Sequence, residues 1–218
     1  MLAVAGCSQS AKQYGEQLYT DPAFAGSKFN AWSCETCHAT KEDDTRLLSG
    51  HPLGGVTKRP TYWGGKSERL IDAASFCYVY FMRGPKAFEA DEPRARALYE
   101  YLASLEGSGD AKPITFVQNI VDVPRGDVAR GEQVYVSACK DCHGELHTGD
   151  GRSSTLASIL PDVKDEYAQL FPGVPPGVVF IEKVRHGQFF AVGGNMPPFG
   201  VERLSDQDLG ALLAYLGL

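Results

Sequence analysis

The pentapeptides "CETCH" at residues 34–38 and "CKDCH" at residues 139–143 share the pattern C-x-x-C-H. This pattern is the attachment signature of c-type haem. Two thiols three positions apart can add to the two vinyl groups of one porphyrin, and the adjacent histidine then lies under the iron as a neutral ligand. We therefore expect two haem c groups. The residues expected to hold them are Cys34, Cys37 and His38 in the first motif and Cys139, Cys142 and His143 in the second.

Two other uses of paired cysteines fit the sequence less well. A zinc ribbon brings together two C-x-x-C pairs that are typically about 15–20 residues apart, whereas Cys37 and Cys139 are separated by the length of a whole domain. A thioredoxin-like redox pair belongs to alternating strands and helices, and neither motif lies in such a pattern. Covalent haem explains both motifs.

The sequence around the motifs repeats. "GEQLY" at 15–19 precedes the first motif and "GEQVY" at 131–135 precedes the second, while "ARALYEYLASL" at 95–105 matches "LGALLAYLGL" at 209–218 in apolar spacing. Each repeat predicts an opening helix, the motif, a loop, a middle helix, a second loop and a closing helix. This order resembles class I cytochrome c domains, in which the opening and closing helices cross beside the haem.

That resemblance implies an all-α chain of two tandem class I cytochrome c domains, each wrapped around one haem. We place the first domain at 12–108, a linker at 109–124 and the second domain at 125–218. The linker carries the apolar stretch "ITFV", so we expect it to pack across the domains. Pro93 suits the first turn of one closing helix, and the pair Ser205-x-x-Asp208 has the form of a capping box before the other.

Residues 1–11 need separate treatment. "AVAGC" ends at Cys7 and resembles the lipobox of bacterial lipoproteins, whose cysteine is acylated after cleavage. This resemblance implies a lipoprotein signal or tether with a lipid anchor at Cys7. The alternative is an untied tail with a stray thiol, because the apolar stretch is short and lacks a basic flank.

Composition excludes other classes of partner. The formal charge of −6 leaves no basic footprint for nucleic acid, and no apolar run is long enough to span a membrane. Residues 125–218 hold 8 basic and 12 acidic side chains, so a partner of the second domain is expected to present a basic face. We expect other cytochromes or a membrane respiratory or photosynthetic complex as partners, in the periplasm or another extracytoplasmic space.

The sixth ligand of the second haem is expected in "GGNMPPFG" at 193–200. Met196 lies in this loop just before the closing helix, as the methionine ligand of class I cytochromes does. A thioether ligand raises the reduction potential of the iron. His147 and His186 are expected at the surface or beside the propionates.

The sixth ligand of the first haem has two candidates. When the two closing helices are aligned, Met82 lies as far before Tyr101 as Met196 lies before Tyr215. When the two middle helices are aligned instead, the first half lacks the methionine loop, and a residue of its middle helix must bind the iron. Cys77 and Met82 would point about 140° apart on an α-helix, so we expect only one of them to face the iron. His51 is a minor third candidate.

"CYVYFMRG" at 77–84 resembles the C-x-x-Y-x-M-x-G stretch of thiosulfate dehydrogenases and, more loosely, a helix of the SoxA subunit of the sulfur-oxidising system. In both families the cysteine is the distal iron ligand, so the resemblance implies that role for Cys77. The segment at 51–70 shows no match to the substrate-binding segments of these families.

The sequence therefore predicts a dihaem cytochrome that transfers single electrons between redox partners. The alternative is a thiosulfate dehydrogenase-like or SoxA-like sulfur-oxidising enzyme, in which the first haem and Cys77 form the active site. A thiolate ligand lowers the potential of one haem while Met196 raises that of the other, which gives electrons a downhill direction in both cases. A dihaem peroxidase is a third class, for which the chain is short.

Overall fold

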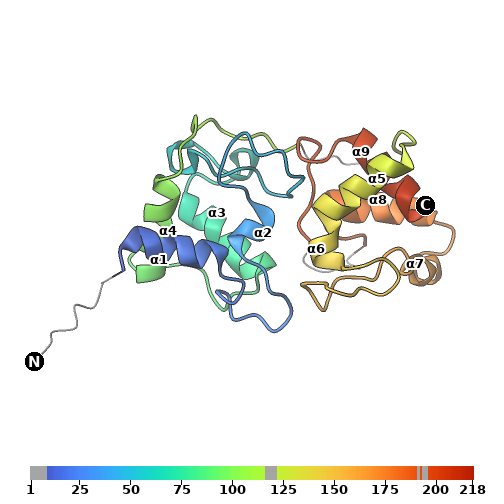
Figure 1. Ribbon diagram of the computed structural model, residues 1–218, viewed down its shortest axis with the longest axis horizontal. Coiled ribbons are helices and arrows are strands. Elements are labelled where there is room, and N and C mark those ends of the chain that lie inside the picture. The colour runs from blue at the N-terminus through green and yellow to red at the C-terminus, as the bar shows by residue number, and fades with distance from the viewer. Residues whose placement is uncertain (1–8, 116–121, 191, 193–195) are drawn as a thin grey trace, which may run out of the picture.

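The computed structural model describes residues 9–115, 122–190, 192 and 196–218. Within these residues the regular elements are helices, and β-pairing is limited to isolated bridges. The predicted all-α class is confirmed. Figure 1 shows two helical lobes side by side, one built from the first half of the chain and one from the second.

The first half contains four α-helices, two 3-10 turns and one π-helical turn among its described residues. In chain order they are α1 (Ala11–Thr20), α2 (Cys34–Cys37), η1 (Val56–Lys58), η2 (Trp63–Gly65), α3 (Leu70–Phe76), η3 (Cys77–Phe81, the π-helical turn) and α4 (Pro93–Ala103). Pro93 stands at the first position of α4, as predicted.

The second half repeats the plan with one further helix in the loop after the motif. Its elements are α5 (Val128–Val134), η4 (Tyr135–Cys139, π-helical), α6 (Lys140–His143), α7 (Lys164–Leu170), α8 (Pro176–His186) and α9 (Asp206–Leu216). The Ser205 hydroxyl accepts a hydrogen bond from the backbone N–H of Asp208, so the predicted start of the closing helix is confirmed.

The opening and closing helices contact each other in both halves, α1 against α4 and α5 against α9. In the first half a Cβ on Gly15 would collide with the carbonyl oxygen of Ala97 and lie 2.8 Å from Cβ of Tyr101. Glycine therefore allows the two helix backbones to approach closely.

The same contact recurs in the second half. A Cβ on Gly131 would collide with the carbonyl oxygen of Ala211 and lie 2.6 Å from Cβ of Tyr215. The glycine of each "GEQ" segment thus lies against an Ala-x-x-x-Tyr pair of the closing helix. The sequence repeat corresponds to a repeat in packing.

Each half has its own buried side chains. One cluster joins the helices of the second half and includes Val134, Val179, Leu209 and Leu212. Two smaller clusters fill the first half, one around the α1–α4 contact and one around Trp32, Tyr78, Phe81 and Met82.

The two halves are joined by hydrogen bonds between loops. The segment before the first motif pairs with the loop after the second: the N–H of Ala31 donates to the carbonyl of Ser153 at 2.9 Å, and the indole N–H of Trp32 donates to the Ser153 hydroxyl at 3.0 Å. Cys142 of the second motif packs against the Trp32 cluster of the first half. The two motifs therefore face the same interface.

The predicted linker follows Ser108, and its described part, 109–115, contacts both halves. The Ser108 backbone and Lys112 bind the Glu42 carboxylate, while the Thr115 hydroxyl binds Glu202 of the second half. Cys7 lies outside the described residues. In the part of the chain that the structure describes, every helix is too short or too polar to span a bilayer.

Candidate haem-binding sites

The first motif forms the short helix α2, and His38 follows its last residue, Cys37. The ring Nδ1 of His38 lies 2.7 Å from the carbonyl oxygen of His51. Because a carbonyl oxygen only accepts, Nδ1 carries the proton and Nε2 keeps its lone pair for a metal. Burial lowers the pKa of His38 and so favours the neutral ring.

The second motif repeats this arrangement. His143 ends α6, and its Nδ1 lies 2.8 Å from the carbonyl oxygen of Ser158. Burial again lowers the pKa of the ring. Both predicted histidines therefore have the tautomer and the protonation state that an iron ligand needs.

A tyrosine ties each motif to its opening helix. The Tyr19 hydroxyl donates to the carbonyl oxygen of His38, and the Tyr135 hydroxyl donates to the carbonyl oxygen of Gly144 at 2.7 Å. Each ring also packs on the tyrosine of the closing helix, at centroid distances of 5.3 Å for Tyr19–Tyr101 and 5.8 Å for Tyr135–Tyr215. The repeated "GEQ-x-Y" segments marked these tyrosines, but not their bond to the motif.

The first half encloses a mostly apolar cavity beside its motif. Cys34, Cys37 and His38 line one part of it. The facing wall comes from α3, η3 and the aromatic side chains around them, which include Leu70, Ala73, Ala74, Cys77, Tyr78, Phe81, Met82 and Phe88. A Cβ on Gly50 would collide with the His38 ring, so the following loop lies directly against the imidazole. Paired thiols, a neutral imidazole and an apolar wall fit a covalently attached haem.

Cys77 and Met82 both line this cavity, which corrects the expectation that they point to different sides. That expectation assumed an α-helix through both residues. The chain instead makes a π-helical turn, in which the N–H of Met82 donates to the carbonyl of Cys77 at 3.1 Å. In this wider turn the residue five positions after Cys77 points more nearly in the same direction as Cys77, so both residues line the same cavity.

Cys77 and Met82 share much of their surroundings, because Cys77 and Cys34 pack against the aromatic cluster to which Met82 belongs. Burial raises the pKa of the Cys77 thiol, and the neighbouring Cys37 and Cys34 add to this shift. Met82 is 5% exposed and packs among aromatic side chains, including Trp32 and Tyr78.

His51 supports the motif of the first half. Its carbonyl accepts from His38, and its ring Nε2 lies 2.8 Å from the carbonyl oxygen of Pro113. The first contact places the His51 backbone beside the His38 ring, and the second holds the His51 ring against Pro113. This position favours orientation of His38 over a role as the distal ligand.

Met196 packs against the core cluster of the second half, to which Cys139 also belongs. Arg185 of α8 holds the loop that follows Met196. Its guanidinium donates to the carbonyl oxygens of Phe199 at 2.9 Å and Leu204 at 2.7 Å, and pairs with Asp206 at 2.7 Å. Sequence reasoning missed Arg185, because a lone arginine in an amphipathic helix is usually at the surface.

The remaining histidines lie apart from the motifs. The His147 side chain is 65% exposed and pairs with Asp162, which confirms its expected surface position. His186 pairs with Glu182 one helical turn earlier, at 2.7 Å.

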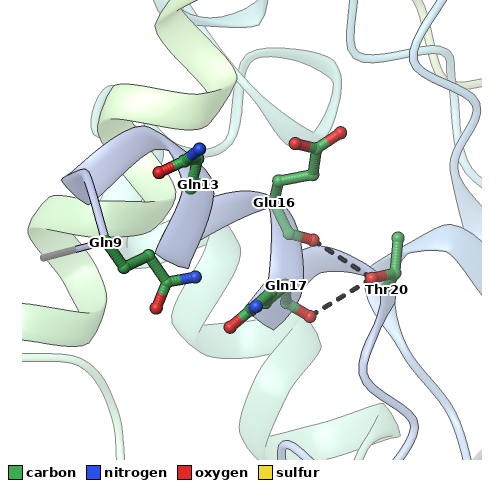
Figure 2. A pocket seen from close by; sticks show the side chains of 5 residues that line it. All are labelled: Gln9, Gln13, Glu16, Gln17 and Thr20. Atoms are coloured by element: carbon green, nitrogen blue, oxygen red, sulfur yellow. Dashed lines mark hydrogen bonds between the residues drawn. The ribbon is translucent and has the colours of Figure 1, made fainter. Parts of the chain in front are cut away.

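A second hollow lies along the outer face of α1, and Figure 2 shows its lining. Its walls are Gln9, Gln13, Glu16, Gln17 and Thr20, and the Thr20 hydroxyl bonds to the backbone carbonyls of Glu16 and Gln17. This lining is polar, open to solvent and remote in sequence from both motifs. We therefore place the candidate sites at the motifs.

Residues 126–216 match the family described as cytochrome c oxidase, cbb3-type, subunit III. This range includes the second motif, so the second half carries a cytochrome c domain. A thiosulfate dehydrogenase from Stutzerimonas stutzeri (strain A1501) is 23% identical over 165 residues, which make up 71% of this chain and 52% of that protein. The chain spans about half the length of this curated relative.

Solved structures give weaker likenesses. A thiosulfate dehydrogenase from Marichromatium purpuratum is 16% identical with a TM-score of 0.43, covering 99% of this chain and 48% of that one. Hydrazine synthase from Kuenenia stuttgartiensis is 18% identical with a TM-score of 0.33, covering 90% and 68%. Neither score supports a functional argument. The cytochrome c domain and the sequence similarity to a thiosulfate dehydrogenase together support a haem electron-transfer protein with covalently bound haem c.

Proposed function

We propose that the chain is a dihaem c-type cytochrome, made of tandem class I domains at 12–108 and 125–218, that transfers single electrons between redox proteins outside the cytoplasm. The observation that carries this proposal is the duplicated motif geometry. In each half a C-x-x-C-H histidine donates its Nδ1 proton to a backbone carbonyl, at 2.7 and 2.8 Å, beneath a glycine-mediated helix contact. Only the second motif lies in the matched family range, so the first haem rests on this repeat.

We further propose a pair of iron ligands for each site. Bound haem supplies a one-electron iron couple whose potential depends on the axial ligands. His143 and Met196 are proposed for the second site. His38 and Cys77 are proposed for the first, because both line the first cavity and "CYVYFMRG" resembles the thiosulfate dehydrogenase stretch in which the cysteine is the distal ligand. Met82, which lines the same cavity, is the alternative.

The surrounding residues exclude water and hold the two sites close together. Apolar side chains line most of the first cavity. Cys142 packs against the core of the first half, and burial together with the nearby Cys37 raises the pKa of its thiol to about 12. The two attachment motifs are therefore neighbours across the interface, which favours electron exchange between them.

The test is the haem content of the full chain, produced in a host that attaches c-type haem. We expect intact mass and a pyridine haemochrome assay to give two covalent haems. The double variant Cys34→Ala/Cys37→Ala should lose one haem, and Cys139→Ala/Cys142→Ala should lose the other. A wild-type chain with one covalent haem or none would refute the dihaem proposal.

The second candidate is a sulfur-oxidising enzyme that acts on thiosulfate at the first site. It is favoured by the thiosulfate dehydrogenase relative and by the place of Cys77 on the cavity wall. Thiosulfate-dependent reduction of ferricyanide measures this activity. Cys77→Ser should change the spectrum of the first haem and abolish the activity, whereas Met82→Leu should preserve both. If the spectrum is unchanged in Cys77→Ser but changed in Met82→Leu, Met82 and not Cys77 is the sixth ligand of the first haem.

We also propose a lipid anchor at Cys7 and an extracytoplasmic location, since c-type haem is attached outside the cytoplasm. Labelling with a radioactive fatty acid tests the anchor, and Cys7→Ala should abolish the label. A cytochrome or a membrane redox complex with a basic face is the proposed partner of the acidic second half.

A further inference from the structure

The cavity of the first half is partly walled by the second half. Pro197, Pro198, Gly200 and Arg203 line it together with the residues of the first motif. These residues follow Met196 in the chain. A group bound in the first cavity therefore touches both halves.

Arg59 is a cation on this wall without a charged partner. The residue is 9% exposed, and its guanidinium donates to the carbonyl oxygens of Pro52 at 2.5 Å and Gly54 at 3.1 Å. Its Nε has no partner among the described residues. The carboxylate of Glu42 instead forms an ion pair with Lys112, at 3.1 Å. A buried cation that meets only neutral carbonyls is costly unless an anion joins it.

Arg203 reaches the same cavity from the second half. Its Nε donates to the carbonyl of Leu48 at 2.9 Å, and a terminal nitrogen donates to the carbonyl of Arg46 at 3.0 Å. In the described parts of the chain no carboxylate forms an ion pair with Arg203, and Asp44 is taken by Arg46 at 3.0 Å. Two guanidinium groups from different halves thus line one cavity with neutral partners. The same cavity is lined by Glu202, whose carboxylate accepts from the Thr115 hydroxyl, and by Arg185, which is paired with Asp206.

We propose that Arg59 and Arg203 bind the carboxylates of the haem in the first cavity, so that the second half supplies an anion-binding residue for the cofactor of the first half. This inference rests on the proposed function. Guanidinium groups suit carboxylates because their donors form charge-assisted, often bidentate, hydrogen bonds. Both positive charges favour the reduced iron over the oxidised iron, so they raise the potential of the first site.

The test compares Arg203→Gln with wild type in a spectroelectrochemical titration of the full dihaem chain. Loss of the positive charge should shift one of the two reduction transitions to lower potential and leave the other in place. Arg203→Lys keeps the charge and should shift that transition less. Arg130→Gln is the matched control, since Arg130 pairs with Asp208 at 2.7 Å between α5 and α9 and does not line the cavity.

Haem content is measured first in every variant. A wild-type chain without haem at the first motif contradicts the proposed function itself. A fully loaded Arg203→Gln chain with unchanged transitions overturns only the present inference. Titrations in chloride buffer and after addition of sulfate separate the two sources of anion: a shift seen without sulfate supports the haem carboxylates, whereas a shift that requires sulfate assigns the arginines to a free oxyanion and overturns the proposal.

Discussion

In the first half Gly15 lies against Ala97 and Tyr101, and in the second half Gly131 lies against Ala211 and Tyr215. The side of the site away from the motif histidine does not repeat in this way. The second half carries a loop with Met196, whereas the first half ends its middle helix in the π-helical turn Cys77–Phe81.

This comparison separates two requirements of the fold. The helix contact and the histidine–carbonyl bond hold the motif, and both halves keep them. The other side of each proposed site would supply the sixth ligand, and there the two halves differ while the helix contact is the same. A π-helical turn makes this change locally, because one wider turn redirects the side chains that follow it.

The largest effect should come from breaking the shared helix contact. Gly131→Val would drive a side chain into the backbone of Ala211, which cannot move without displacing α9. We expect the free energy of unfolding to fall by about 3 kcal/mol or more, with loss of haem from the second motif. Gly15→Val should do the same to the first half. Urea unfolding and haem content per motif measure both effects.

Gly177→Ala provides the control for these glycine variants. A Cβ at this position in α8 meets no atom within 4 Å. Its stability should stay the same or rise by about 0.5 kcal/mol, because alanine restricts the unfolded chain. Equal losses in Gly177→Ala and Gly131→Val would mean that the close helix contact is not what requires glycine.

The next effect sharpens the difference between the halves. Arg185→Met removes the bonds to the carbonyls of Phe199 and Leu204 and the pair with Asp206. We expect a loss of about 3 kcal/mol, since two buried carbonyls lose charged donors. If Met196 binds the iron as proposed, its ligation should also weaken, which the sulfur-to-iron charge-transfer band would show. The exposed pair of Arg130 with Asp208 is the comparison, and Arg130→Met should cost at most about 1 kcal/mol. An intact band in Arg185→Met would exclude this role of Arg185.

The sequence sufficed for what depends on local patterns. The two C-x-x-C-H motifs, the repeated "GEQ" segments and the apolar spacing around Leu98 and Leu212 predicted the helix order and the all-α class. The starts of α4 and α9 were predicted from Pro93 and Ser205, because a helix start depends on the residue type at its first positions. These features require no knowledge of contacts between distant segments.

Features that depend on backbone geometry and long-range contacts could not be predicted in this way. No residue pattern marked the π-helical turn, so the relative directions of Cys77 and Met82 were wrong. Arg185 and Arg203 act on carbonyls that are distant in the chain or in the other half. Every residue has a backbone carbonyl, so the residue type does not show which carbonyl accepts a hydrogen bond from an arginine. These partners can be identified only in the folded structure.

A smaller effect tests the similarity of the two motifs. Tyr135→Phe leaves the carbonyl of Gly144 without its hydroxyl donor, and Tyr19→Phe does the same to the carbonyl of His38. We expect each variant to lose about 1–2 kcal/mol of stability, with similar values in the two halves. Tyr99→Phe, on an exposed face of α4, should change little. Chemical unfolding of the three variants measures the differences, and a loss in only one half would show that the motifs are held differently.

The smallest effect concerns a contact that belongs to the first half. Hydrogen bonds from Ser108, joined by Lys112, lower the pKa of Glu42 to about 2. A carboxyl group with a depressed pKa in the folded state stabilises the protein above its unfolded pKa, and this contribution is lost as the pH falls toward 2. Urea unfolding between pH 6 and pH 3 should therefore show a steeper loss of stability in wild type than in Glu42→Gln. The Glu68→Gln variant, at an exposed site that forms no ion pair with the described residues, should follow wild type. If Glu42→Gln also follows wild type, the segment after α4 is held by its backbone contacts with Gly54 and Gly55 rather than by this carboxylate.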